Sequence, residues 1–130
     1  MSQALPDVEG LVISYLAPLL GVPVKTRVPD PLPDVFLQVV RTGGPARNRI
    51  LEEAQVTFTA WALAGPTPEI TAIELARQAR KLMMEAANRD GIALIRRVQE
   101  FAGIYGNDDP VTNCPRYTFT LALRVRAAGG

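Results

Sequence analysis

One stretch of alternating residues constrains the fold of this chain more than any other feature of its sequence. It runs from Ile50 to Leu63 and reads ILEEAQVTFTAWAL. Apolar residues occupy every second position on one side, formed by Ala54, Val56, Phe58, Ala60 and Ala62. Successive side chains of a strand point to opposite faces, so this period of two predicts a long β-strand with one buried face. A second run, Arg116 to Arg126, alternates in the same way and predicts another strand of the same sheet.

Helical spacing and chain breakers predict two helices. The first is expected at Leu5–Leu20, with Pro18 ending or kinking it near Ala17. The second is expected from Pro68 to about Arg89. We expect its buried stripe to pack on the apolar face of the Ile50–Leu63 strand; the stripe consists of Ile73, Ala76, Ala79, Met83 and Ala86.

Three further strands complete the predicted sheet. An edge strand is expected at Val22–Val28 and a second strand at Val35–Val40. Residues 92–105 fit either a helix, through the spacing of Leu94, Val98 and Ala102, or a strand; we favour a strand from about Ile95, because Gly91 ends the preceding helix and the last strand needs a partner. Residues 41–49 are expected to form a loop between two antiparallel strands. The order α-β-β-β-α-β-β predicts an α+β fold, with one domain over residues 1–130 and a mostly antiparallel sheet packed by two helices.

The composition argues against most kinds of catalytic and metal site. The chain has no histidine, which excludes Ser-His-Asp and Cys-His sites and His-ligated zinc. Its one cysteine, Cys114, cannot build a thiolate zinc or iron–sulfur site. The net charge of +1 gives no general argument for a nucleic-acid or membrane partner. We therefore predict a protein that is not an enzyme and that holds no cofactor and no metal.

A few residues remain as candidates for contacts with other proteins. The loop at 41–49 is basic and contains Gly43-Gly44, but it matches neither the P-loop nor the dinucleotide fingerprint. The strand that follows carries two adjacent acids, whose side chains point to opposite faces and do not share a metal or a proton. The same strand carries a tryptophan among threonines, where an aromatic ring is a candidate interface anchor. The predicted interface residues are Arg41, Arg47, Arg49, Glu52, Glu53 and Trp61.

The chain resembles the short tail-terminator, or tail-completion, proteins of long-tailed phages. The likeness lies in its size, its element order and three stretches: Phe36–Arg41 leading into GGPARNR, the Leu51–Ala62 strand, and the closing PVTNCPRYTFTLALRVR. The resemblance implies a structural protein of the virion, a homo-oligomeric ring commonly of six copies. Such a ring sits on the last ring of tail-tube protein, stops tube polymerisation and offers a surface to the head connector, while DNA passes through its lumen. The family has no catalytic residues.

In such a ring, we expect the arginines of the 41–49 loop to contact protein. Their partners would be carboxylates on the tail tube or on a neighbouring copy, such as Glu52 and Glu53. The rival interpretation is that these arginines line the lumen and touch DNA. The near-neutral charge and the need for DNA to pass without being gripped favour protein partners.

Two alternative functions stay open at this point. One is another ring or adaptor of the phage neck, such as a head-closure protein, which sequence does not separate from a terminator. The other is a small enzyme or ligand-binding domain, which would need Asp, Glu and Arg side chains converging in a pocket. No motif of the sequence requires such a pocket.

Overall fold

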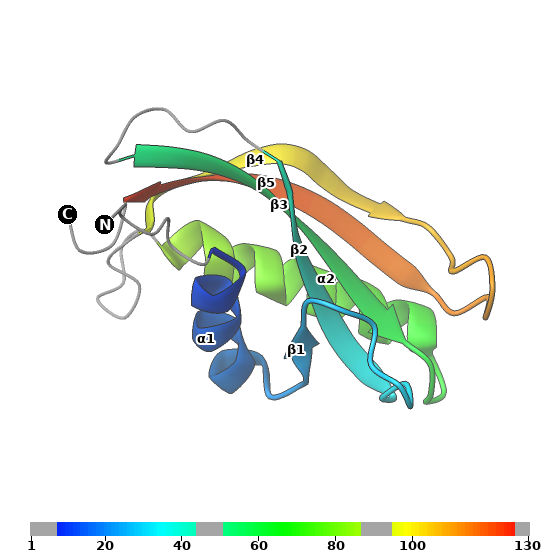
Figure 1. Cartoon of the computed structure of the whole chain (residues 1–130). Helices are drawn as coiled ribbons and strands as arrows, with labels where there is room; N and C mark the ends of the chain where they lie inside the picture. Colours follow the sequence, from blue (N-terminus) through cyan, green and yellow to red (C-terminus); the bar gives the residue numbers. More distant parts are fainter. Residues whose placement is uncertain (1–7, 44–50, 87–94, 127–130) are drawn as a thin grey trace.

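Two helices lie against one face of a five-stranded sheet (Figure 1). The structure is a computed structural model and describes residues 8–43, 51–86 and 95–126. The element order is that predicted, α-β-β-β-α-β-β, in an α+β fold. The elements are α1 (Val8–Leu20), β1 (Val24–Lys25), β2 (Val35–Gly43), β3 (Leu51–Ala62), α2 (Pro68–Glu85), β4 (Ile95–Gly106) and β5 (Arg116–Arg126).

The two alternating runs lie side by side near the middle of the sheet. The strand order is β1-β2-β3-β5-β4, and every pair is antiparallel except β1 with β2. The pairing of β3 with β5 extends without a register shift from Leu51↔Arg126 to Trp61↔Arg116. Residues directly opposite one another share a face, so the alternation of β3 matches that of β5 along the whole pair. This places both apolar faces on the side of the helices, as predicted.

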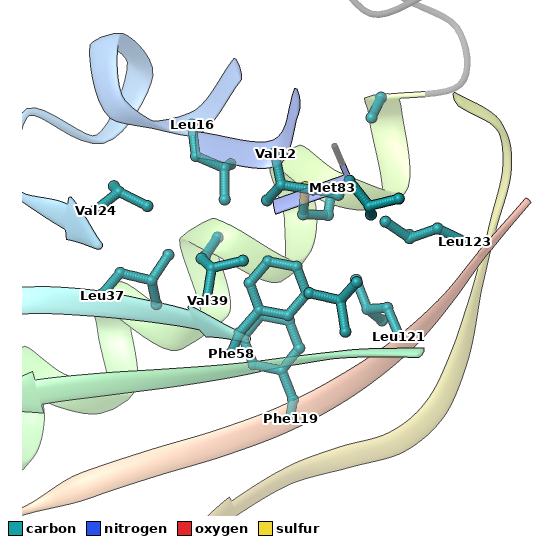
Figure 2. Packing of buried hydrophobic residues seen from close by; sticks show 14 of the residues in the cluster. Val12, Leu16, Val24, Leu37, Val39, Phe58, Met83, Phe119, Leu121 and Leu123 are labelled. Carbon is teal, nitrogen blue, oxygen red and sulfur yellow. The ribbon is translucent and has the colours of Figure 1, made fainter. Parts of the chain in front are cut away.

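The core is built around an aromatic pair on these two strands. Phe58 and Phe119 stand opposite each other, are fully buried, and stack with ring centroids 4.7 Å apart. Buried side chains of both helices belong to the same cluster, and Figure 2 shows Val12 of α1 and Met83 of α2 beside the pair. Tyr15 of α1 also donates a hydrogen bond of 2.7 Å to the carbonyl oxygen of Leu82. The helices are therefore fixed to each other as well as to the sheet.

The helix α2 is rotated slightly from its predicted orientation. Ile73 is only half-buried and lies outside the core cluster, so its predicted place in the buried stripe is wrong. Successive residues of a helix point about 100° apart around its axis, so Ala72 and Ile73 lie on different sides of it. The buried stripe contains Ala72 instead of Ile73, and its members within α2 are Ala72, Leu75, Ala76, Ala79 and Met83. Three alanines in this set allow the helix axis to lie close to the sheet.

Several predicted boundaries also need correction. The strand expected at Val22–Val28 is only two residues long, although its edge position is confirmed. The predicted end of the first helix at Leu20 is confirmed, because α1 continues through Pro18 to Leu20 and Gly21 ends it at φ 69°, with its amide donating to the carbonyl of Ala17 at 3.1 Å. The loop expected from residue 41 begins later, because β2 extends to Gly43 through a bulge. The predicted helix ends at Leu5 and Arg89 lie outside the described residues.

Candidate interaction surface

The face of the sheet turned away from the helices is polar, and we call it the outer face. Two pairs of threonines stand opposite each other on β3 and β5. The hydroxyl oxygens of Thr57 and Thr120 are 2.9 Å apart, and those of Thr59 and Thr118 are 3.3 Å apart. These pairs link the two strands on the side that the helices do not cover. The middle of the outer face is therefore polar rather than a second hydrophobic core.

An aromatic cluster lies on the outer face where β3 ends. Phe36 of β2 stands opposite Trp61, and the two rings stack with centroids 5.2 Å apart. The guanidinium of Arg116 lies over the indole ring at 4.9 Å from its centroid, a cation–π contact. Trp61 is only 4% exposed, and its indole Nε1 is buried without a hydrogen-bond partner. Trp61 thus lies on the predicted face, but its ring is covered by its own chain. Its role as an interface anchor stays a prediction.

The turn between β4 and β5 is tied to this cluster through Arg116. The guanidinium donates from Nε to the carbonyl oxygen of Asn107 at 2.9 Å, and its Nη1 lies 3.4 Å from Oδ1 of Asp109. Both the hydroxyl and the amide of Thr112 donate to Oδ2 of Asp109, at 2.7 and 2.9 Å. These hydrogen bonds, with a smaller contribution from Arg116, hold the pKa of Asp109 below its ordinary value. These contacts hold the turn between β4 and β5 against the start of β5.

At the other end of β3, a second charged cluster surrounds a shallow hollow of about 50 Å³. Arg124 of β5 stands opposite Glu53 on β3, and its Nη2 donates to Oε1 of Glu53 at 3.1 Å. Arg97 of β4 stands opposite Arg124 on its other side. The Nε of Arg124 is buried without a hydrogen-bond partner. This cluster therefore holds two guanidinium groups around one carboxylate.

The structure brings only some of the predicted interface residues into contacts. Arg41 stands opposite Val56, which places it on the helix side of the sheet, and its amide donates to Oε2 of Glu9 at 3.0 Å. Glu52 lies in β3 opposite Val125. Arg47 and Arg49 lie outside the described residues. Because Glu53 already bonds to Arg124 of its own chain, an arginine of a neighbouring copy would have to compete for that carboxylate.

Sequence reasoning missed the partners that stand beside the predicted residues. Phe36 lies two residues before Gln38 and so shares the outer face, which the alternation within β2 already indicates. The run RVR at 124–126 likewise places Arg124 and Arg126 on one face. That Phe36 lies beside Trp61, and Arg124 beside Glu53, depends on the strand register, which a single sequence does not provide.

The described ranges contain neither a group of metal-binding side chains nor a helix that could span a membrane. Within residues 8–43, 51–86 and 95–126, no three His, Cys, Asp or Glu side chains group so as to hold a metal ion. No helix in those ranges has the length and apolarity needed to cross a membrane. Cys114 is half-buried, and its Sγ lies 4.0 Å from the carbonyl oxygen of Thr112.

No family model and no curated protein sequence matches this chain. The function is therefore inferred from the sequence and from the geometry of the structure.

Proposed function

We propose that this chain is a tail terminator, a structural protein of a phage virion. Copies form a ring, commonly of six, on the last ring of tail-tube protein. The ring stops further polymerisation of the tube and offers the surface to which the head connector binds. The proposal is supported by the resemblance of three stretches of the sequence to such proteins, and by a fold with the element order that this resemblance implies.

The observation that carries most weight is a sheet left open on one face and along one long edge. β4 pairs only with β5, and no other described strand lies along its outer side over its twelve residues. Phe101 and Tyr105 on this strand are 61% and 52% exposed, and Val111 in the following turn is 87% exposed. An exposed edge strand that carries large apolar side chains marks a surface suited to another protein chain.

The sheet also has two dissimilar edges, which suits a ring. At the opposite edge, the two-residue β1 covers β2 only at Leu37 and Gln38. A ring is built from heterologous contacts, in which one surface of a subunit meets a different surface of the next. An asymmetric sheet with one long and one short edge offers two such surfaces without requiring a two-fold contact.

DNA passes through the ring in this proposal without being recognised. Of the described arginines, Arg80, Arg116 and Arg124 already bond to carboxylates of the same chain. These three pairs are neutral and do not attract phosphates, whose binding would depend strongly on salt. The partners of the ring are therefore tail-tube protein and head-connector protein, and its location is the tail or neck of the virion.

The direct experiment is electron microscopy of particles assembled with and without this chain. A terminator's absence leaves overlong tails and heads without tails, and labelled copies of the chain lie at the head-proximal end of the tube. Tails of normal length joined to heads in the absence of the chain would contradict the proposal. Copies that stay on heads while tail length is normal would instead indicate a head-closure protein.

A further inference from the structure

Four arginines gather where β4 begins and β5 ends, at the left of the sheet in Figure 1. We call this group the basic end: Arg96, Arg97, Arg124 and Arg126. A register shift between Ile95 and Arg97 makes Arg96 an extra residue, so that two arginines of β4 lie beside one arginine of β5. Arg96, Arg97 and Arg126 are exposed and make no hydrogen bond or ion pair in the part of the chain that the structure describes.

Among the described side chains, the basic end holds more arginines than bonded carboxylates. Glu53 is the one carboxylate that bonds to an arginine of this group among the described residues. Like charges directly opposite each other in a sheet destabilise it, as Arg97 does opposite Arg124. The hollow lined by Glu53, Arg97 and Arg124 leaves room for a further carboxylate beside the two arginines.

Exposed carboxylates gather at the opposite end of the same sheet. We call this group the acidic end: Asp34, Glu69 and Asp108. Asp34 directly precedes β2, Glu69 lies in the first turn of α2, and Asp108 lies in the turn after β4. All three are exposed, and their carboxylates have no partner within the described ranges. Arg116, the first residue of β5, forms an ion pair with Asp109, the acid that follows Asp108.

The two ends of one copy are too far apart to neutralise each other. β3 spans them with twelve residues, or about 40 Å of strand. Electrostatic interactions in physiological salt are screened beyond about 8 Å. Among the described residues, exposed arginines without a carboxylate partner therefore lie at one end of the sheet, and exposed carboxylates without a partner lie at the other.

We propose that the basic end of one copy binds the acidic end of a second copy. This inference rests on the proposed ring and deepens it, because it names a charged contact between neighbouring copies in addition to the surfaces that the two sheet edges offer. The contact is heterologous, so repeating it generates a closed ring or a chain of copies. A second copy is favoured over DNA because the complementary charges are present on the same chain in similar number. Phosphates would match the basic end but would leave the acidic end without a partner.

The experiment uses two charge-reversed variants of the full chain. The basic-end variant is Arg97→Glu with Arg126→Glu, and the acidic-end variant is Asp34→Arg with Asp108→Arg. Sedimentation velocity at about 0.05 M salt should find the wild type associated and each variant at least about tenfold weaker in self-association. Each variant keeps one native end and its reversed end has the opposite charge to the reversed end of the other, so an equimolar mixture should recover the association that each variant alone has lost. Arg77→Glu is the matched control, because Arg77 is an exposed, unpartnered arginine of α2 on the other side of the sheet.

A salt series on the wild type makes the test independent of whether the variants fold. Raising the salt to about 0.5 M should dissociate the copies, since screening then acts over about 4–5 Å. Monomeric wild type at low salt, or association that salt and both variants leave unchanged, would overturn the inference. So would salt-sensitive binding of duplex DNA that only the basic-end variant loses. If such a chain still capped the tail tube, the proposed function would stand and only this contact would be wrong.

Discussion

The packing of Phe58 provides the sharpest test of the fold. Its ring is fully buried, stacks on Phe119 at 4.7 Å with an interplanar angle of 5°, and faces the helices. Phe58→Ala removes this contact and leaves a cavity in the core, which costs about 3–5 kcal/mol of unfolding free energy. A domain of this size is stable by about 5–15 kcal/mol in total. At roughly 3–5 °C per kcal/mol, the melting temperature should fall by about 10–20 °C.

The matched control is Phe101→Ala on β4. Phe101 is 61% exposed, so the same truncation should change stability by no more than about 0.5 kcal/mol. Both variants are measured by thermal and urea unfolding at one protein concentration. A double-mutant cycle with Phe119→Ala should give a coupling of about 0.5–1.5 kcal/mol for the aromatic pair. If Phe58→Ala melted with the wild type, or if Phe101→Ala lost as much, the assignment of these two strand faces would be refuted.

Three further predictions concern Trp61, the β4–β5 turn and the arginines of the 41–49 loop. Trp61→Phe should change stability by less than about 1 kcal/mol, because the buried indole N–H that it removes has no hydrogen-bond partner among the described residues. Trp61→Ala should cost about 3–5 kcal/mol, because it leaves a cavity. Equal urea midpoints for the two variants would contradict this prediction. Thr112→Val should raise the pKa of Asp109, measured by carboxyl NMR titration, because it removes the hydroxyl that lowers it most. An unchanged titration of Asp109 in Thr112→Val would refute this assignment. Since the folded-state pKa of Asp109 is lowered, its contribution to stability is present above the ordinary Asp pKa and is lost as the pH falls through the lowered value. Arg47→Glu with Arg49→Glu should leave the subunit folded but yield overlong or headless tails in electron micrographs, and normal tails joined to heads would exclude a role for these arginines.

The sequence predicted best what depends on periodicity. The unbroken alternation of β3 and β5 determined which residues face the helices, and the structure confirms Ala54, Val56, Phe58 and Phe119 in the core. β4 was harder to interpret because three register shifts interrupt its pairing and break the period of two. For α2, the pattern was compatible with two orientations of the helix. Packing against the sheet selected the one that buries Leu75 rather than Ile73.

Features that depend on contacts between distant segments were not predictable from one sequence. Trp61 was placed on the correct face, but its burial requires Phe36 and Arg116, which lie on two other strands. The length of β1 depends on how far it can pair with β2, and an extended-looking segment around Pro23 pairs over only two residues. The charged clusters at the ends of the sheet also arise from strand order and register, because Arg97 and Arg124 are 27 positions apart in the chain.

The most direct measurement of the central claim is the length of tail tubes polymerised in vitro from the tube protein of the same phage. With this chain added during assembly, electron microscopy should reveal shorter tubes, each capped at one end by a single ring that contains the chain. The tubes should not resume growth when more tube protein is supplied. Tubes of unchanged length without a ring at either end, or capped tubes that keep growing at that end, would contradict the account.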